Sequence, residues 1–239
     1  MTTLRRSLYA MMFLSLFSAA YGNEALVEAA KKGDVAAVNK VLEAKTDIDA
    51  RHNNATALMW AAKNGHDDVV KILIDKGADV KAEDGAGYSP LVYAAIQGHT
   101  DILSLMIEHG ADVNAKTKNG KSVLTWAVEN GRTETARELI KKGADVNVKS
   151  PCGASLVLTA IIGGHTDTAI MLVGNNIDIN AADEDGATPL MMAAEAGNAE
   201  LVKFLLEKGA DHSLKDSEGQ SARDHAELSE NEEVIELLQ

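Results

Sequence analysis

The sequence predicts an all-α solenoid, in which short helix-turn-helix repeats stack side by side. The first observation behind this prediction is a 33-residue period, which recurs in three separate ladders of glycine. The second is that residues able to start a helix return with the same period. The first ladder comprises Gly65, Gly98, Gly131, Gly164 and Gly197, the second Gly77, Gly110, Gly143 and Gly209, and the third Gly120, Gly153, Gly186 and Gly219.

Each ladder has a local cause. A glycine of the first ladder ends a short helix, because the residue after a helix often turns left-handed and glycine does so without strain. A glycine of the second ladder ends the longer helix that follows, and Asn176, which fills one place there, tolerates the same conformation. The third ladder lies in a tight turn that leads into the next repeat.

Helix starts are equally regular. Serine or threonine precedes the first helix of each repeat, and its hydroxyl can accept a hydrogen bond from an otherwise unpaired backbone amide. Pro90 and Pro189 follow two of these residues at the first helical position, where a missing N–H has no consequence. The second helix carries apolar residues at helical spacing, as in Val69, Val70 and Leu73. The six starting residues are Thr56, Ser89, Ser122, Ser155, Thr188 and Ser221.

A family resemblance follows from these segments. The stretch DGATPLMMAAEAGNAELVKFLLEKGADHSL, residues 185–214, resembles the ankyrin repeat almost throughout, and the resemblance extends over residues 23–239. It implies one domain with short β-hairpin-like fingers between the helix pairs and a curved, L-shaped array. The expected repeats are an N-terminal cap at 23–50, internal repeats at 51–83, 84–116, 117–149, 150–182 and 183–215, and a C-terminal cap at 216–239.

The chain departs from the family pattern in two ways. The histidine usual after the TPL tripeptide is absent, which removes the basis for the usual hydrogen-bond chain between repeats. The repeat at 150–182 contains Gly163 and Gly164 and is expected to be the softest, because glycine lowers helix stability by roughly 1 kcal/mol relative to alanine. The residues in place of that histidine are Met59, Val92, Thr125, Leu158 and Met191.

Residues 1–22 have the pattern of a signal peptide. Arg5 and Arg6 precede an apolar stretch at 8–20 that is too short to span a bilayer comfortably. We expect cleavage between Gly22 and Asn23, with cleavage after Ala20 and an uncleaved anchor as the alternatives. The mature chain would then be periplasmic, or secreted as the second possibility. No later segment is long and apolar enough to cross a membrane.

Composition limits the class of partner. The formal net charge is −13, with 36 acidic residues against 23 Lys and Arg, so neither nucleic acid nor an anionic membrane surface is an expected partner. A basic protein partner would suit this charge, although acidity alone also keeps a protein soluble. Aromatic residues make up 4% of the chain and hydrophobic residues 46%, which predicts an aliphatic, alanine-rich core.

The sequence offers no catalytic or metal site. His66, His99 and His165 lie one repeat apart, which is about 10 Å in a helical stack and too far for one zinc ion. We therefore expect a structural role for them. No nucleophile elbow and no phosphate-binding loop occurs, so we expect neither an enzyme nor a cofactor. Cys152 is a lone thiol in a finger, expected to be a small structural residue, with a redox role as the alternative.

The aromatic residues point to a binding surface. Trp60, Tyr93 and Trp126 lie one period apart, at a position that the ankyrin resemblance places on the concave groove, and Tyr88 stands at the base of a finger. The alternative is that each ring only covers neighbouring side chains. We expect a polar rim from the fingers and helix ends, formed by His52, Asn53, Lys63, Asn64, Gln97, Lys118, Asn119, Glu129 and Asn130.

The expected function is binding of a partner protein by a chain that is monomeric when unbound. A rigid concave surface has little ordering cost on association. Some exported bacterial ankyrin proteins of this size resemble the chain and neutralise secreted antibacterial toxins, including phospholipase effectors, so an immunity protein is the specific hypothesis. The alternatives are an accessory or stress-protection protein of the envelope, for example one supporting a catalase, and a host-directed secreted effector.

Overall fold

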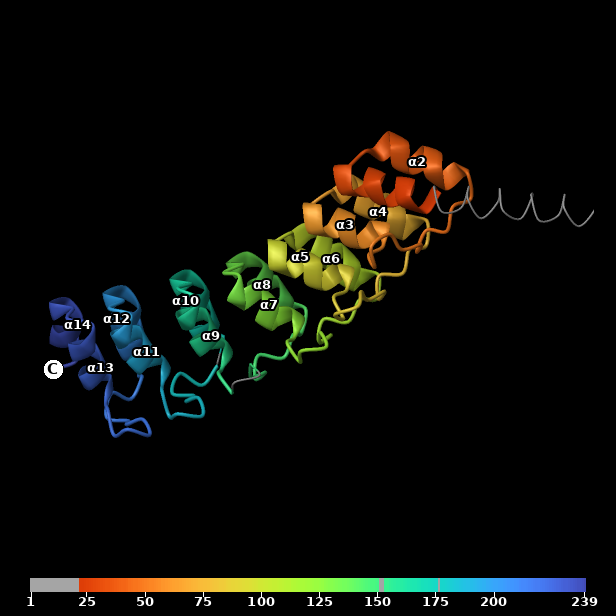
Figure 1. Ribbon diagram of the computed structural model, residues 1–239. Helices are drawn as coiled ribbons and strands as arrows, with labels where there is room; N and C mark the ends of the chain where they lie inside the picture. The colour runs from red at the N-terminus through yellow and green to blue at the C-terminus, as the bar shows by residue number, and fades with distance from the viewer. Residues whose placement is uncertain (1–21, 151–152, 176) are drawn as a thin grey trace, which may run out of the picture. The chain divides into compact units, whose positions relative to one another are not determined.

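The computed structural model describes residues 22–150, 153–175 and 177–239, and the described chain is all-helical (Figure 1). The predicted signal segment before Gly22, Cys152 and Asn176 therefore lie outside the described residues. The chain forms two compact blocks, an N-terminal block that ends at Asp112 and a C-terminal block, Val113–Gln239. The boundaries drawn from the sequence for individual repeats stay a prediction.

The N-terminal block consists of helix pairs. Residues 22–32 are helical and pair with α2, and the following pairs are α3 with α4 and α5 with α6. Within this block α3 packs beside α5 and α4 beside α6 (Figure 1). The bounds are α2 Val35–Glu43, α3 Ala57–Asn64, α4 Asp67–Asp75, α5 Pro90–Gln97 and α6 Thr100–Glu108.

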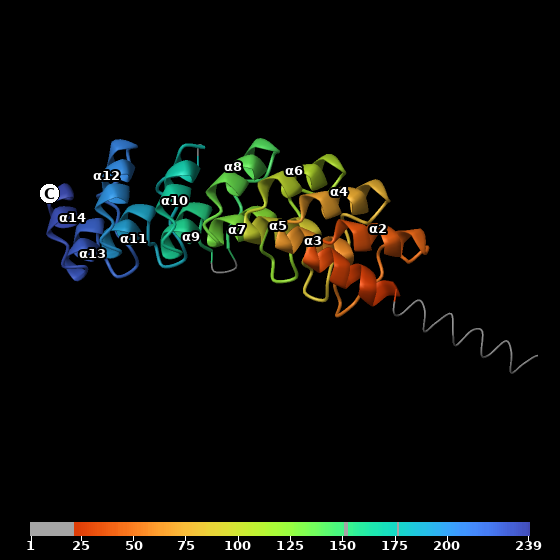
Figure 2. The ribbon, with the colours of Figure 1, turned by 90° about the horizontal axis from the view of Figure 1, so that it is seen from above.

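The C-terminal block repeats the same arrangement four times. Figure 2 shows its first helices, α7, α9, α11 and α13, in one row and the second helices α8, α10 and α12 in another. The bounds are α7 Val123–Glu129, α8 Thr133–Lys141, α9 Leu156–Ile162, α10 Thr166–Val173, α11 Pro189–Glu195, α12 Ala199–Glu207, α13 Ala222–Leu228 and α14 Glu232–Leu237.

Local sequence signals explain where the helices begin and end. All six predicted serine and threonine residues are N-caps, and the side-chain oxygen of each accepts from the backbone N–H three residues later. Pro90 and Pro189 occupy the first turn, as expected. The glycines of the three ladders have positive φ, between 63° and 93°. These predictions are confirmed.

The core is aliphatic and alanine-rich, as composition predicts. Alanine recurs at one position of the first helices with no exposed surface, where a small side chain lets neighbouring helices approach closely. Leucine or methionine fills the equivalent place on the second helices and is also fully buried. The buried alanines are Ala61, Ala94, Ala127, Ala160, Ala193 and Ala226, and the second-helix residues are Leu73, Met106, Leu139, Leu172 and Leu205.

Hydrogen bonds do connect successive repeats, although the usual histidine is missing. The sulfur of Met59, which takes its place, lies 3.4 Å from the backbone nitrogen of Thr56 within the same repeat. The connections come instead from the start of the second helices, where Nε2 of His66 lies 3.0 Å from the carbonyl oxygen of Lys31. His165 makes the same contact with the carbonyl of Glu129, also at 3.0 Å. These histidines are structural.

A second set of connections joins the segments that follow the second helices. The backbone N–H of Asp79 donates to Oδ1 of Asp49 at 2.9 Å. The N–H of Asp145 donates to Oδ1 of Asn114, and the N–H of Asp211 to Oδ1 of Asn180, both also at 2.9 Å. A short side chain on one repeat thus satisfies a backbone donor of the next. We call this recurring bond the Asx ladder.

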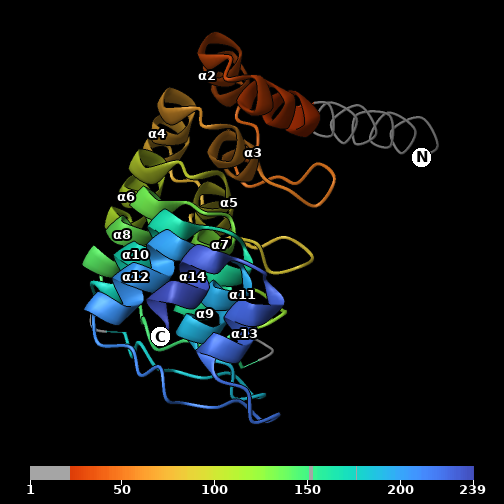
Figure 3. The ribbon, with the colours of Figure 1, turned by 90° about the vertical axis from the view of Figure 1, so that its left-hand side faces the viewer.

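The fingers are short turns. His52 and Ala55 form an antiparallel bridge, and the two residues between them, Asn53 and Asn54, have φ of 53° and 65°. Asparagine is one of the few residues that adopts this left-handed conformation readily, which explains the two-residue turn. Figure 3 shows this loop extending beyond the ends of α3. No helix of the described residues is long and apolar enough to span a bilayer.

Candidate protein-binding surface

Two aromatic side chains lie side by side on the first helices of the N-terminal block. Trp60 belongs to α3 and Tyr93 to α5, and both rings are half-buried. They pack on a buried cluster of Ala55, Met59 and Ala82. One side of each ring therefore contributes to the core, while part of its surface remains exposed to solvent.

Lysines lie over these rings. Nζ of Lys31 is 4.8 Å from the centroid of the Trp60 ring, and Nζ of Lys63 is 4.9 Å from it. Lys63 is also 5.5 Å from the Tyr93 ring. A cation over an aromatic face is attracted electrostatically, and each exposed contact of this kind stabilises the structure by about 0.5–1 kcal/mol. The result is a cationic and aromatic patch, Lys31, Trp60, Lys63, Tyr88 and Tyr93, which we call the Trp60 surface.

The Tyr93 hydroxyl on α5 forms a hydrogen bond with the finger that precedes this helix. It donates to Oδ2 of Asp84 at 2.7 Å, and the Tyr88 ring centroid lies 5.6 Å from that of Tyr93. Partial burial raises the pKa of Asp84, but the Tyr93 hydroxyl and the backbone N–H groups of Tyr88, Ala86 and Gly87 together lower it below its usual value. Burial and the neighbouring carboxylate raise the pKa of Tyr93.

The same kind of hydrogen bond, between a first helix and the finger before it, recurs in the C-terminal block. Nε1–H of Trp126 donates to Oγ1 of Thr117 at 3.1 Å, and Nε2 of His225 lies 2.8 Å from Oδ2 of Asp216. In all three cases a side chain of the first helix reaches a finger residue nine positions earlier. The alternative structural role raised for the aromatic position is therefore real, and it coexists with ring surface that remains accessible.

The C-terminal aromatic has its own charged neighbours. Nζ of Lys121 lies 4.7 Å from the Trp126 ring and 2.7 Å from Oε2 of Glu129. Asn130 donates from Nδ2 to the carbonyl oxygen of Trp126 at 2.8 Å, and Oδ1 of Asn119 accepts from the hydroxyl of Thr117 at 2.6 Å. Both amide side chains thus form hydrogen bonds within the fold, in addition to any contact with a partner.

The predicted rim falls into two groups, one on each block. The N-terminal group includes Asn64, whose Nδ2 donates to the carbonyl oxygen of Lys31 at 2.7 Å, and Gln97, which is exposed. His52 and Asn53 shape the finger turn. Lys118 is exposed in the C-terminal group. The prediction that these residues contact a partner stays a prediction.

Two apolar side chains that the repeat pattern did not single out are exposed on the C-terminal block. Ile162 is 63% exposed and Leu228 67% exposed, and they are the exposed large hydrophobic residues of the described chain. They are the last residues of α9 and α13. Glu129 and Glu195 end α7 and α11 in the same way. We call these four residues the Ile162 row; their 33-residue spacing is visible in the sequence.

Removing the Tyr93 hydroxyl tests the finger contact. We expect Tyr93→Phe to lower the free energy of unfolding by about 1.5 kcal/mol or more at pH 7, because a hydrogen bond to a charged group is lost. Asp84 has a lowered pKa in the folded chain, so its contribution is present above the unfolded pKa and disappears as pH falls through the folded one. In urea titrations the difference in unfolding free energy between Tyr93→Phe and the wild type should therefore narrow as the pH falls below the ordinary Asp pKa of about 4.

Asp84→Asn is the control for this measurement. Asparagine keeps an acceptor for the Tyr93 hydroxyl but does not titrate. In the Asp84→Asn background the effect of Tyr93→Phe should no longer depend on pH. An effect of equal size at pH 7 and pH 3 in the wild-type background would show that the hydroxyl does not act through the carboxylate.

The family follows from the whole pattern of repeats. The family model for ankyrin repeats in three copies matches residues 11–84, 83–150 and 156–239. The chain belongs to the ankyrin-repeat family. Ankyrin repeats bind protein partners, and their fold generally serves as a binding scaffold and not as an enzyme. Among the described residues, no group of three or more His, Cys, Asp or Glu is placed to hold a metal ion.

Two solved ankyrin structures are similar over most of their length. One is an ankyrin repeat domain from Acinetobacter baumannii AYE, 38% identical, with a TM-score of 0.70, covering 78% of this chain and 98% of that one. The other is a chain in the structure of the predatory endopeptidase Bd0816 of Bdellovibrio bacteriovorus in complex with immunity protein Bd3460. It is 33% identical, with a TM-score of 0.70 and the same coverage, 78% and 98%.

Curated relatives share only a segment. The Caenorhabditis elegans ankyrin repeat and KH domain-containing protein mask-1 is 43% identical over 58 residues, which is 24% of this chain and 2% of that protein. The rat 26S proteasome non-ATPase regulatory subunit 10 is 42% identical over 52 residues, 22% of this chain and 21% of that subunit. The chain thus spans about a fifth or less of the curated relatives it matches, and the similarity concerns the repeats.

Proposed function

We propose that the mature chain is a periplasmic immunity protein, which binds and neutralises an exported enzyme harmful to the cell that makes it. The observation that carries the proposal is the similarity to a chain from the endopeptidase–immunity protein structure, at 33% identity over 98% of that chain. Binding of a protein partner is what ankyrin repeats do in general. The inhibitory role and the periplasmic site are the additional content of the proposal.

The Trp60 surface and the Ile162 row support docking of a protein, and they indicate which chemical groups of that protein would contact the chain. The Trp60 surface combines two half-buried rings with two lysines, which suits a carboxylate of the partner seated among apolar groups. The Ile162 row alternates exposed apolar residues with carboxylates, which suits an apolar segment flanked by Lys or Arg. Aromatic residues and fully desolvated apolar contacts carry most of the energy in such interfaces.

Export is the first requirement of the proposal. Removal of residues 1–22 takes away Arg5 and Arg6 and no acid, so the formal charge changes from −13 to −15. We expect osmotic shock of a Gram-negative bacterial host to release the protein with Asn23 as its N-terminal residue. The measurement is N-terminal sequencing by mass spectrometry. A cytoplasmic product that retains Met1 would contradict the periplasmic assignment.

Inhibition is the decisive test. The enzymes to assay are exported hydrolases, phospholipases and peptidases first, and any such enzyme found to be encoded beside this chain has priority. We expect residues 23–239, added in equimolar amount, to abolish the activity of one of them and to protect cells that carry it in the periplasm. A chain that binds an envelope enzyme such as a catalase and leaves it active would instead be an accessory protein, and the immunity role would be wrong.

A further inference from the structure

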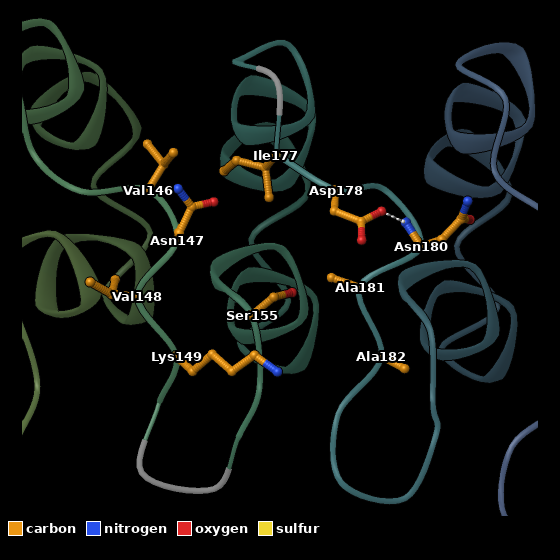
Figure 4. A pocket seen from close by; sticks show the side chains of 10 residues that line it. All are labelled: Val146, Asn147, Val148, Lys149, Ser155, Ile177, Asp178, Asn180, Ala181 and Ala182. Atoms are coloured by element: carbon orange, nitrogen blue, oxygen red, sulfur yellow. Dashed lines mark hydrogen bonds between the residues drawn. The ribbon is translucent and has the colours of Figure 1, made fainter.

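A hollow of about 420 Å³ lies within the C-terminal block, between the segments that follow α8 and α10 (Figure 4). Its apolar lining includes Val148, Ile177 and Ala181, and its polar lining includes Asn147 and Asp178. A volume of this size with mostly apolar walls and a few polar groups is typical of ligand pockets. The hollow shares no residue with the Trp60 surface or with the Ile162 row.

The hollow lies where one hydrogen bond of the Asx ladder is missing, and we call this position the open step. At the other steps with an acceptor, the side chain of Asp49, Asn114 or Asn180 receives the backbone N–H of the next repeat at 2.9 Å. Asn147 holds the same place in the sequence ADVNV, and Asp178 is its counterpart. Among the described residues, no hydrogen bond joins the Asn147 side chain to the Asp178 N–H. An acceptor and a donor are therefore left open at the hollow.

The flanking contacts show that the opening is local. The carboxylate of Asp178 accepts from the N–H of Asn180 at 2.9 Å, as the dashed line in Figure 4 shows, and Asp145 and Asp211 make the same contact at the closed steps. Asn180 in turn completes the next ladder step, to Asp211. The open step falls in the repeat whose second helix, α10, has 8 residues, against 9 for α8 and α12.

We propose that this hollow binds an extended peptide segment of the partner protein. A peptide group carries both halves of the missing bond, since its N–H can donate to Oδ1 of Asn147 and a carbonyl oxygen can accept from the N–H of Asp178. The apolar lining receives a small apolar side chain next to that peptide group. Addition of a backbone to open donors and acceptors is an established mode of peptide recognition. The proposal rests on the proposed function only in requiring a protein partner.

Hydrogen exchange tests the open step directly in the unbound mature chain. We expect the amide of Asp178 to exchange at least tenfold faster than those of Asp145 and Asp211, whose N–H groups are bonded across repeats. Asn114→Ala should lower the unfolding midpoint in urea, because it breaks a ladder bond, whereas Asn147→Ala should leave the midpoint unchanged. Equal protection of the three amides would overturn the proposal.

Binding is tested with peptides from a display library of random heptamers, which are selected for binding to the mature chain. We expect the enriched synthetic peptides to slow exchange at Asp178 and to lose affinity at least tenfold with Asn147→Ala, while Asn114→Ala changes affinity less than twofold. Failure to enrich any peptide, or equal binding to both variants, would overturn the peptide site. Neither outcome affects the immunity proposal, which is measured by inhibition of an enzyme.

Discussion

Replacing Gly131 with alanine should lower the free energy of unfolding by about 3 kcal/mol or more. Gly131 has φ of 63°, where an alanine is strained by roughly 1–2 kcal/mol. Its added methyl group would lie 2.5 Å from Nδ1 of His165, so the ring must move. That movement disrupts the 3.0 Å contact of His165 Nε2 with the Glu129 carbonyl, which joins two repeats. Overpacking and a lost hydrogen bond then add to the backbone strain.

Gly143→Ala is the matched control for this substitution. Gly143 also has positive φ, 93°, but nothing lies within 4 Å of an added methyl group. Its substitution should therefore cost only the backbone strain, about 1–2 kcal/mol. Urea unfolding followed by circular dichroism measures both, and the double variant Gly131→Ala with His165→Ala should lose less than the two single effects added. Equal losses for Gly131→Ala and Gly143→Ala would show that the histidine ring is not a constraint.

The second large effect concerns binding. We expect Trp60→Ala and Trp126→Ala each to weaken binding of the partner by about 2 kcal/mol or more, because interface energy concentrates in a few aromatic residues. Ile162→Glu should have a similar effect on the C-terminal block, since it places a charge in an exposed apolar contact. The measurement is calorimetric titration of each variant against the partner enzyme. Lys203→Ala, an exposed substitution on α12, serves as the control.

The stability of each variant against urea distinguishes a structural role of the residue from a role in binding. Trp60 packs on Met59 and Trp126 holds Thr117, so their alanine variants should also unfold at lower urea concentration. Ile162 is 63% exposed, so its variant should lose affinity alone. Loss of stability with normal affinity in both tryptophan variants would mean that the rings serve only the fingers. The binding surface would then consist of the Ile162 row without them.

Much of the fold could be predicted because its causes are local. A capping hydroxyl at Ser122, a proline at position 90 and a glycine with positive φ at position 131 each act within one turn of backbone. A strict period then places each local signal at the same point of every repeat. The helix pairs, their caps and the alanine-rich core are therefore readable from the sequence.

The candidate site was only partly readable. The period singled out Trp60, Tyr93 and Trp126, and the structure places Trp60 and Tyr93 together on adjacent helices of one block. The same period could have picked out Ile162 and Leu228, but an apolar residue at a helix end looks like core until its exposure is known. Hydrophobicity alone does not distinguish the two, because much of any protein surface is apolar.

The sequence by itself determined the repeat, the helix boundaries and the aliphatic core, since backbone conformation and short-range hydrogen bonds decide these within a few residues. Only the tertiary structure decided which side chains meet across longer separations. The bond from Tyr93 to Asp84, the packing of His165 on Gly131 and the open step at Asn147 all depend on how neighbouring segments approach one another. That approach is set by packing in three dimensions, which a periodic pattern does not encode.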